Sequence, residues 1–323
     1  MRALITGGAG FIGSHLAEAL LAEGHEIVVL DDLSTGRVEN LHAVRRHTGL
    51  SLVEGSVTDR ELVVKLCAGV EIVYHLAAAV GVRLILERPV ETIATNIVGA
   101  EVVLRAAARD GIPVVLASTS EVYGKNDRVP LSEEDDRLLG PTTKSRWSYA
   151  CAKAIDEFLG LAYHRERGLP VVILRFFNTV GPRQTGRYGM VVPRFVRQAL
   201  DGEPITVYGD GQQTRSFTDV EDAVRMTVAL SRSPAAAGEV FNVGTSHEVS
   251  IAEVAHRIKV LTGSGSPIRY VPYDEAYQPG FEDLRRRVPD ARKAERLVGF
   301  GPRTTLDETL GRVIRFLRET GRR

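Results

Sequence analysis

The stretch Thr6-Gly7-Gly8-Ala9-Gly10-Phe11-Ile12-Gly13 lies near the start of a 323-residue chain and decides how its first half folds. The apolar run Arg2–Thr6 precedes it and the amphipathic run Phe11–Glu23 follows it, so Gly7, Gly10 and Gly13 fall between a predicted strand and a predicted helix. Glycine there lets the chain turn tightly, lets backbone N–H groups approach a pyrophosphate and lets helix pack on strand. Because a helix N-terminus also favours phosphate charge, the stretch predicts a dinucleotide-binding turn.

The residue that ends the second predicted strand distinguishes between NAD and NADP. This residue is Asp31, directly after the apolar run Glu26–Leu30. Its carboxylate can accept hydrogen bonds from both hydroxyls of the adenosine ribose, and it would repel a 2′-phosphate. We therefore predict NAD rather than NADP as the cofactor.

Short apolar runs alternate with amphipathic stretches through the first half of the chain. Predicted strands are Arg2–Thr6, Glu26–Leu30, Leu52–Glu54, Glu71–His75, Val114–Ser118 and Val171–Arg175, and predicted helices are Phe11–Glu23, Asp59–Cys67, Val90–Asp110 and Trp147–Arg167. Alternating strands and helices of this kind predict an α/β fold with a doubly wound, Rossmann-type parallel sheet covered on both faces.

The pattern changes after Asn178, where Gly, Pro and Arg become frequent. The segment 218–243 again has the pattern of a helix followed by a strand, and we expect it to return to the sheet. The sequence thus predicts an NAD-binding domain of residues 1–178 plus about 216–244. A smaller, interleaved C-terminal α/β substrate domain then takes about 179–215 plus 245–323.

Composition excludes several classes of protein. Lys and Arg together number 41, equal to Asp and Glu, and this balance argues against a general nucleic-acid or membrane-surface binder. Two cysteines, Cys67 and Cys151, make neither a disulfide framework nor a metal cluster, so we expect no metal and a cytoplasmic protein. We expect no signal peptide ahead of the strand at Arg2 and no membrane-spanning segment.

Two residues four positions apart carry the predicted chemistry. Tyr149 and Lys153 share one face of a predicted helix. A free tyrosine has a pKa of about 10, too high for a base near neutral pH. A Lys ammonium and a nicotinamide cation nearby favour the phenolate, which can take a proton from a sugar hydroxyl while hydride leaves. Thr119, at the end of a predicted strand, is placed to hydrogen-bond the same hydroxyl.

The glycine turn, Ser118-Thr119 and the Tyr149/Lys153 pair together resemble the extended short-chain dehydrogenase/reductase family over essentially the whole chain. The resemblance implies that both Tyr149 and Lys153 also contact NAD. It further implies cofactor contacts from positions near the carboxyl ends of the strands. These are Gly7, Gly10, Phe11, Ile12, Gly13, Asp31, Asp32, Ser56, Val57, Leu76, Ala77, Ala78 and Asn96.

The second half is similar to the nucleotide-sugar branch of that family. Arg175-Phe176-Phe177-Asn178-Thr179-Val180-Gly181-Pro182-Arg183 matches its Arg-x-x-Asn-x-x-Gly-Pro-Arg signature, and Tyr208–Arg215 resembles its nucleotide-diphosphate loop. A guanidinium suits a pyrophosphate, so Arg215 is expected to face it. The resemblance implies a UDP-linked sugar held by Asn178, Arg183, Val192, Tyr208, Gln213, Arg215 and Arg287.

The pair Ser120-Glu121 distinguishes between the reactions that members of this branch catalyse. The 4,6-dehydratases of the family place Asp-Glu there, and the simple 4-epimerases a small or apolar residue. Ser-Glu resembles the UDP-glucuronic acid decarboxylases, as do the segments 144–153 and 285–290, which implies catalytic roles for Ser120, Glu121 and Arg287. A UDP-sugar 4-epimerase remains the alternative, followed by a 4,6-dehydratase. A non-catalytic NAD-binding regulator has no need of the intact catalytic set.

Three further expectations complete the picture. The segment Ala79–Pro89 departs from the Pro-rich, Tyr-containing loop of xylose-forming decarboxylases, which bears on the choice of sugar. His75 and Cys151 are interpreted as packing residues. The resemblance implies a homodimer formed by the helices that begin near Val90 and Trp147, with an apolar face at Ile93, Ile97, Val102, Ala106, Phe158 and Leu161.

Overall fold

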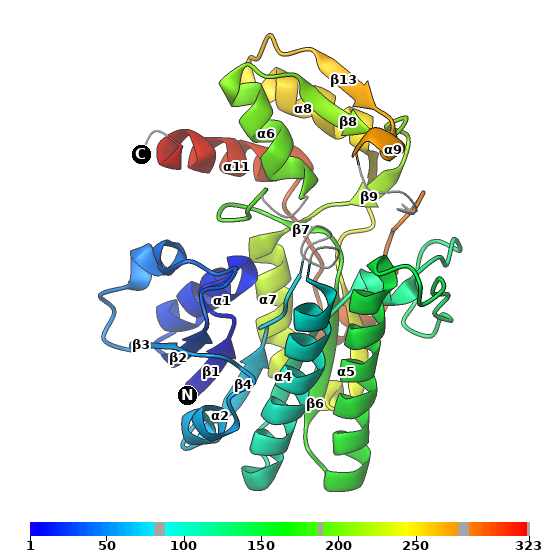
Figure 1. Cartoon of the computed structure of the whole chain (residues 1–323). Coiled ribbons are helices and arrows are strands. Elements are labelled where there is room, and N and C mark those ends of the chain that lie inside the picture. The colour runs from blue at the N-terminus through cyan, green and yellow to red at the C-terminus, as the bar shows by residue number, and fades with distance from the viewer. Residues whose placement is uncertain (81–87, 187–189, 277–283, 322–323) are drawn as a thin grey trace.

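The computed structural model of the chain describes residues 1–80, 88–186, 190–276 and 284–321. A larger lobe is built on a parallel sheet, and a smaller lobe lies beside the carboxyl ends of its strands (Figure 1). The sheet has seven strands in the order β11-β6-β5-β4-β1-β2-β3, and every neighbouring pair is parallel. They are β1 (Arg2–Thr6), β2 (Glu26–Asp31), β3 (Leu50–Glu54), β4 (Ile72–His75), β5 (Val114–Thr119), β6 (Val171–Phe176) and β11 (Glu239–Val243).

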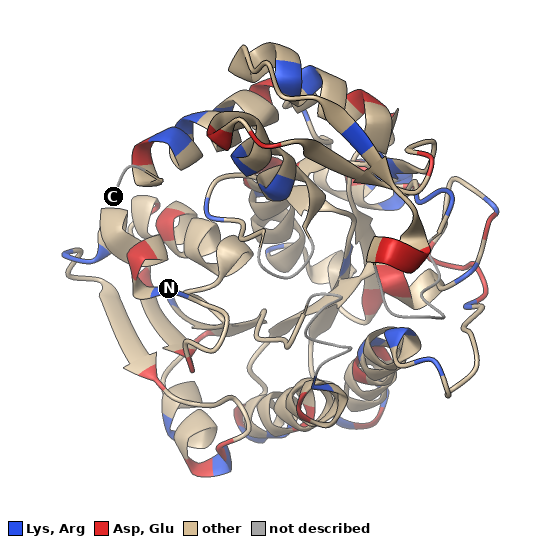
Figure 2. Cartoon of the chain, turned by 45° about the horizontal axis from the view of Figure 1, so that its top comes forward, with Lys and Arg blue, Asp and Glu red and all other residues tan. Residues whose placement is uncertain are grey.

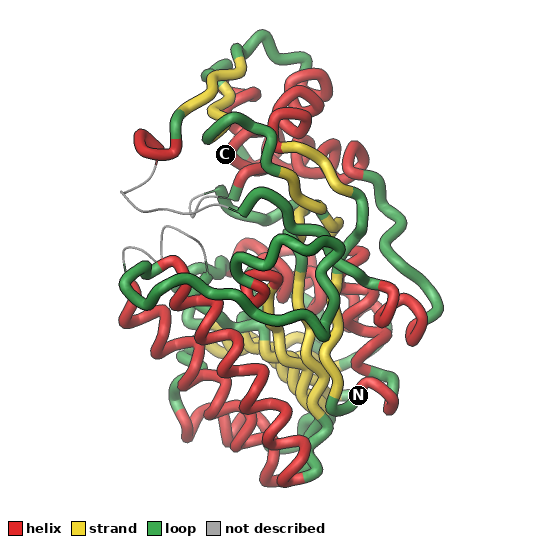
Figure 3. The backbone as a smooth tube through the Cα atoms, turned by 90° about the vertical axis from the view of Figure 1, so that its right-hand side faces the viewer, coloured by secondary structure: helices red, strands yellow, loops and turns green. Residues whose placement is uncertain are grey.

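Helices cover both faces of the sheet, as Figure 3 shows. Successive strand residues point to opposite faces, so Ile5 of β1 belongs to one core and Leu4 to the other. One face is covered by α1 (Phe11–Ala22), α7 (Val220–Ser231) and α10 (Arg292–Val298), and the other by α2 (Arg60–Cys67), α4 (Pro89–Asp110) and α5 (Arg146–Arg167). The predicted doubly wound Rossmann-type fold is confirmed.

Helix ends follow the local sequence closely. Asp59 caps α2 by accepting a hydrogen bond from the Leu62 N–H at 3.1 Å. Gly111 and Gly168 end α4 and α5 with φ of 67°, a left-handed conformation that favours glycine. The long helices therefore begin and end within a residue of the predicted bounds.

The smaller lobe has its own core, in which Phe195 and Val254 are fully buried. It contains α6 (Val191–Asp201), β8 (Ile205–Tyr208), α8 (Ile251–Thr262), β13 (Ile268–Val271), α9 (Tyr273–Ala276) and α11 (Leu306–Thr320), with β8 and β13 paired in parallel. Two further short pairs lie outside the seven-stranded sheet: β7 (Thr179–Val180) with β10 (Thr218–Asp219), and β9 (Thr214–Ser216) with β12 (Glu248–Ser250). Single turns are η1 (Val38–Val44), η2 (Ser120–Tyr123) and η3 (Pro234–Ala236). Figure 2 shows acidic and basic residues mixed over the helices of this lobe.

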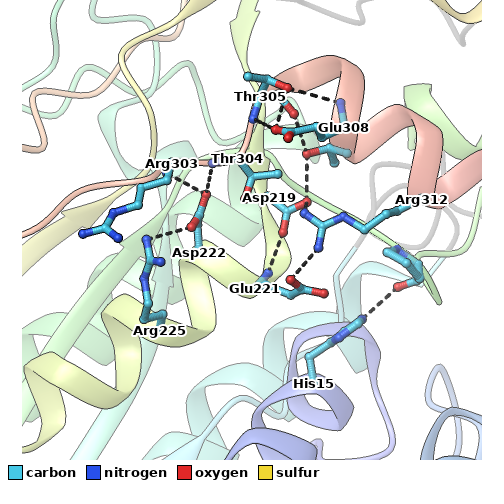
Figure 4. A network of polar contacts seen from close by, with 12 residues as sticks. His15, Asp219, Glu221, Asp222, Arg225, Arg303, Thr304, Thr305, Glu308 and Arg312 are labelled. Carbon is cyan, nitrogen blue, oxygen red and sulfur yellow. Dashed lines mark hydrogen bonds and ion pairs between the residues drawn. The ribbon is translucent and has the colours of Figure 1, made fainter.

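A polar network fastens the start of α11 to the start of α7, where the two lobes meet (Figure 4). Arg312 of α11 binds Asp219 at 2.8 Å and Glu221 at 2.5 Å. Asp222 accepts hydrogen bonds from the backbone N–H groups of Arg303 and Thr304, at 2.9 and 2.7 Å. These contacts fix the smaller lobe over the sheet.

The chain crosses between the lobes more than once. The segment 218–243 forms α7 and then β11, and so returns to the sheet as the sequence pattern indicates. Residues 292–298 return as well, because α10 buries Ala294 in the core beneath α7, whereas the expected boundary assigns all of 245–323 to the smaller domain. The apolar face of this short helix explains the difference.

Candidate active site

A cavity of about 790 Å³ lies between the carboxyl ends of the strands and the smaller lobe. It includes the crevice between β1 and β4, where the strand order changes direction and where open α/β sheets bind ligands. Most of the predicted site residues line it. They are Gly7, Gly10, Phe11, Ile12, Gly13, Asp31, Asp32, Val57, Leu76, Ala77, Ala78, Thr119, Ser120, Glu121, Tyr149, Lys153, Asn178, Val192, Tyr208, Gln213, Arg215 and Arg287.

The glycine turn shapes the cofactor end of the cavity. Gly7 has φ of 72°, and the Gly10 N–H donates to its carbonyl oxygen at 3.1 Å. A Cβ on Gly13 would lie 2.3 Å from the Gly7 oxygen and 2.7 Å from the Gly8 Cα, so only glycine fits there. Gly10 begins α1 without a side-chain cap, which leaves the first N–H groups of the helix available to a phosphate.

Asp31 is buried at the end of β2, between the glycine turn and the next loop. Its Oδ2 accepts from the Ala9 N–H and its Oδ1 from the Leu33 N–H, each at 2.9 Å. Burial raises the pKa of Asp31, and these two N–H groups oppose that rise. The carboxylate is thus held in one orientation at the cavity wall, as a residue that receives two ribose hydroxyls requires.

Three predicted contacts do not line the cavity. Ser56 pairs with Thr58 at 2.8 Å, and Asn96 binds the backbone N–H and carbonyl of Ala79 at 2.9 and 3.3 Å. Asn96 therefore shapes the wall from behind. The segment 79–89, expected to bear on the choice of sugar, lies outside the described residues from 81 to 87.

Arg183 is the third predicted contact that does not line the cavity, and it lies against α1 of the larger lobe instead. Its Nη2 donates to the Glu18 Oε1 at 2.6 Å and its Nη1 to the Ser14 Oγ at 3.2 Å, both on α1. The family signature assigns the Arg183 guanidinium to the substrate, but here it binds the carboxylate of Glu18 on α1. In this structure Arg183 links α1 to the loop after β7.

The predicted catalytic residues Tyr149 and Lys153 lie one turn apart on α5, and Thr119 ends β5. Burial, followed by the carboxylates of Glu121 and Asp156, raises the pKa of Tyr149 well above its ordinary value, while a hydrogen bond with Thr119 opposes the rise. From the sequence we expect Lys153 to favour the phenolate, but in the structure its ammonium is paired with Asp156 at 3.0 Å. With burial and two carboxylates raising the pKa, the phenol of the protein alone keeps its proton.

Sequence reasoning missed the acidic pair beneath these residues. Lys153 Nζ donates to the Asp156 Oδ2 at 3.0 Å, and both side chains are buried. Glu157 accepts from the Ser118 Oγ at 2.5 Å and from both Arg175 Nε and Nη2, at 2.9 and 2.8 Å. Their spacing of one turn from Lys153 on the same helix is the signal that could have found them.

The sugar end of the cavity is a carboxylate among arginines. Glu121 Oε1 receives a hydrogen bond from Arg287 Nη1 at 2.6 Å, and Glu121 Oε2 lies 3.4 Å from Arg146 Nη2. Burial raises the pKa of Glu121, but Arg287 and Arg146 outweigh it, with a smaller effect from Arg215, and lower the pKa to about 2. Glu121 is therefore ionised at neutral pH. Arg146 was not predicted, although it precedes Tyr149 by three residues on the same helix.

The nucleotide end of the cavity is formed by the smaller lobe. Arg215 Nη1 donates to the carbonyls of Thr214 and Leu284, both at 2.7 Å, which aligns its guanidinium in the wall. Gln213 Nε2 donates to the Tyr208 carbonyl at 2.8 Å. The Arg194 guanidinium, another residue that sequence reasoning missed, stacks 3.8 Å from the centroid of the Tyr208 ring. An arginine beside an aromatic ring and a buried amide suits a base and its phosphates.

Other candidate ligands have structural roles. His75 is buried and its Nδ1 bonds the Thr6 hydroxyl at 2.8 Å, and burial lowers its pKa to about 3, as for a neutral packing residue. Cys67 and Cys151 are both free thiols. Among residues 1–80, 88–186, 190–276 and 284–321, no group of three or more His, Cys, Asp or Glu side chains is arranged to hold a metal ion. No helix within those same ranges is long and apolar enough to cross a membrane.

The Rossmann-type sheet, the glycine turn and the Thr-Tyr-Lys set define an NAD-dependent enzyme of the extended short-chain dehydrogenase/reductase class. The chain belongs to the NAD dependent epimerase/dehydratase family, whose model matches residues 3–244, and NAD is its cofactor. The glycine turn, which lines the cavity, and the oriented Asp31 fit that cofactor.

Similar proteins lie within this family. The chain is 44% identical to a UDP-N-acetyl-alpha-D-glucosaminuronate decarboxylase of Bacillus cytotoxicus, over 98% of each chain. It is 40% identical to the UDP-glucuronic acid decarboxylase 1 of Xenopus tropicalis, over 98% of this chain and 72% of that one. Among solved structures, a UDP-glucose 4-epimerase of Thermotoga maritima with UDP-glucose superimposes with a TM-score of 0.89 at 32% identity, over 99% of each chain.

Proposed function

We propose that the protein is a UDP-hexuronate decarboxylase: it oxidises C4 of the sugar, releases the C6 carboxylate as carbon dioxide, and reduces the pentose that remains. The observation that carries this proposal is the sugar end of the cavity. Arg146 and Arg287 lie beside the ionised carboxylate of Glu121. Among the described residues that contact one another there, two guanidinium groups and one carboxylate leave a net positive charge, which suits a sugar that brings a carboxylate of its own.

The residues account for each step. The positive charge that bound NAD brings beside Tyr149 favours its phenolate, which takes the proton of the C4 hydroxyl while Thr119 holds the same oxygen. NAD, when bound, accepts the C4 hydride and later returns it. The C6 carboxylate is then that of a β-keto acid, so the C5–C6 bond breaks and its electron pair passes to the C4 oxygen as an enolate. Tyr149 and Thr119 can stabilise that oxygen.

The proton that C5 must then gain has a restricted source. Glu121 has a pKa of about 2 and carries no proton to give near neutral pH. We propose the Arg287 guanidinium, whose Nη1 lies 2.6 Å from Glu121 Oε1, or water that it holds, as the donor. Ser120 is buried beside them and lines the same wall. Glu121 thus orients Arg287 and repels the departing carboxylate.

Two UDP-uronates fit this chemistry, and the similarity of the chain to decarboxylases named for each of them favours testing both. The relative with the 2-acetamido sugar in its name is 44% identical, and the relative named for UDP-glucuronate is 40% identical. Both substrates carry the C6 carboxylate that the arginines suit. We propose UDP-glucuronate or its 2-acetamido analogue as substrate, with the same three steps.

The test is incubation of the purified protein with UDP-glucuronate, UDP-N-acetylglucosaminuronate and UDP-glucose, followed by mass spectrometry. Decarboxylation removes about 44 mass units from a uronate, and epimerisation yields an isomer without a change of mass. Turnover without added NAD in excess of enzyme is expected, because each cycle regenerates it. Epimerisation of UDP-glucose without loss of carbon dioxide from either uronate would support the 4-epimerase, the alternative favoured by the solved epimerase structure.

We also propose a cytoplasmic homodimer. The outer faces of α4 and α5 expose apolar side chains, namely Val90, Ile93, Val98, Ile155 and Phe158. Val102 and Ala106, expected on that face, are instead buried against the sheet, because the helix turns them inward. Light scattering at micromolar concentration should give twice the monomer mass of 35.3 kDa, and the monomer mass would contradict the dimer. Free thiols rather than a disulfide support a reducing compartment.

A further inference from the structure

The contact between Glu121 and Arg287 joins residues 166 positions apart, at 2.6 Å. Arg287 lies in an irregular segment, so something outside it must hold it in place. The Leu131 N–H donates to the Val288 carbonyl, and the Asp290 N–H donates to the Leu131 carbonyl, each at 2.8 Å. A short extended piece around Leu131 therefore carries the segment that presents Arg287.

Asn242 of β11 lies where these pieces cross, and its side chain is fully buried. Its Nδ2 donates to the Leu131 carbonyl at 2.9 Å and to the Asp290 carbonyl at 3.1 Å. Its Oδ1 accepts from the Tyr123 hydroxyl at 2.7 Å. Both amide hydrogens and the amide oxygen make hydrogen bonds, so only one orientation of the side chain keeps all three of them.

The third partner leads directly to Glu121. Tyr123 is the last residue of η2, the turn that also contains Glu121, and its hydroxyl accepts from Arg175 Nη1 at 2.9 Å. Asn242 is thus bonded to the turn that carries Glu121, to the segment that carries Arg287 through Asp290, and to the piece around Leu131 that holds this segment. It does not itself line the cavity.

We propose that Asn242 is a positioning residue: by joining η2 to the segment 287–290 it sets the Glu121–Arg287 geometry on which decarboxylation and protonation of C5 depend. The oxidation step relies on different elements, β5 and α5, which carry Thr119, Tyr149 and Lys153. Loss of the Asn242 contacts should therefore separate the two steps. The inference rests on the proposed function, because only a decarboxylase uses the pair after oxidation.

The experiment is a single turnover with wild type and Asn242→Asp. The aspartate keeps an acceptor for Tyr123 but sets an oxygen against two carbonyls in place of the N–H donors. Formation of NADH, followed at 340 nm by its known absorbance, should proceed nearly as in wild type. Release of carbon dioxide should slow by about 10²-fold, the scale of a displacement of about 1 Å in an active site. Equal slowing of both steps would show a merely structural residue and overturn the proposal.

A milder variant keeps the test valid if Asn242→Asp does not fold. Tyr123→Phe removes only the hydroxyl and should slow carbon dioxide release by about 3- to 10-fold, the scale of one hydrogen bond, with NADH formation unchanged. Tyr74→Phe is the matched control, because Tyr74 is also a buried tyrosine, and its hydroxyl bonds Ser231 of α7 at 2.8 Å rather than Asn242. It should leave the ratio of the two steps at the wild-type value. An unchanged ratio in Tyr123→Phe counts against the proposal.

Failure of the proposed function and failure of the role of Asn242 give different results. If wild type releases no carbon dioxide from either UDP-uronate, the proposed function is refuted and this role of Asn242 with it. If wild type decarboxylates while Asn242→Asp and Tyr123→Phe keep the wild-type ratio of the two steps, only the inference about Asn242 is refuted.

Discussion

The two ends of the cavity are built in opposite ways. At the cofactor end, Gly7, Gly10 and Gly13 follow one another within a turn, and the backbone itself makes the site. At the sugar end, Glu121, Arg146 and Arg287 come from η2, α5 and an irregular segment, and meet only because the whole chain has folded. The first end depends on conformation and the second on long-range contacts, so substitutions should affect them differently.

The largest effect is expected at the sugar end. Glu121→Gln keeps the shape of the side chain and removes its charge, so Arg287 loses its ionic partner. With UDP-glucuronate this variant should still reduce bound NAD, while release of carbon dioxide or of the pentose slows by about 10²-fold or more, the scale of a displaced active-site group, because Arg287 loses the carboxylate that orients it. Rapid-quench assays beside absorbance at 340 nm would measure both steps.

The control for that experiment is Tyr149→Phe, which should abolish both signals, since every reaction considered begins with loss of the C4 proton and hydride. If Glu121→Gln turns over a UDP-hexose at nearly the wild-type rate, and wild type decarboxylates neither uronate, the 4-epimerase reading replaces the decarboxylase.

The contrast also explains what the sequence predicts well. The order of strands and helices follows from apolar periodicity, and the glycine turn and Asp31 follow from local geometry, so each is readable from a few adjacent residues. The Glu121–Arg287 pairing is not local and was not predicted; only the likeness of Ser120-Glu121 and of segment 285–290 to a known family indicated that both residues belong to the site. The Asn242 contacts could not be predicted, because they depend on where β11 and the segment around Leu131 come to lie.

The next effect in size is at the cofactor end. Gly13→Ala would place a Cβ 2.3 Å from the Gly7 oxygen, and backbone cannot yield as a side-chain tip can. Overpacking of this kind costs about 1–3 kcal/mol, so NAD affinity should fall by about 10- to 100-fold. Calorimetric titration with NAD would measure it. Gly311→Ala is the matched control, because a Cβ there meets no atom within 4 Å; equal losses in both variants would contradict the argument.

A smaller effect is expected for Arg146, the arginine that sequence reasoning missed. Arg146→Lys keeps the positive charge but loses the guanidinium fork near Glu121. We expect KM for the UDP-uronate to rise by about 10-fold, the scale of one charge-assisted hydrogen bond, with a smaller change in kcat. The exposed Arg105 of α4 offers the control Arg105→Lys. A kcat that falls as much as kcat/KM would instead place Arg146 in the chemical step.

The smallest expected effect concerns the joint between the lobes rather than either end of the cavity. His15 lies on α1, and its Nε2 is 3.1 Å from the Pro182 carbonyl, where it donates (Figure 4). Burial, with a further effect from Arg183, lowers the pKa of His15 from 6.5 to about 4. Below pH 6.5 His15 therefore binds a proton in the unfolded chain but stays neutral in the folded chain until the pH approaches 4. The neutral His15 contributes fully to the free energy of unfolding above pH 6.5, and this contribution is lost as the pH falls toward 4.

His15→Gln should reveal that contribution. Glutamine can still donate to the Pro182 carbonyl but does not titrate, so the variant should lose less stability than wild type between pH 6.5 and 4. The difference in slope should be up to about 1.4 kcal/mol per pH unit, the linkage value for one proton. Urea unfolding at several pH values would measure it, with pH 7.5 to 8.5 as the range in which the two slopes should agree. His75, whose pKa burial lowers to about 3, also makes the free energy of unfolding fall below pH 6.5, and this part of the slope should persist in the variant. Identical slopes in variant and wild type below pH 6.5 would show that His15 gains its proton in the folded state, and that the joint opens to water there.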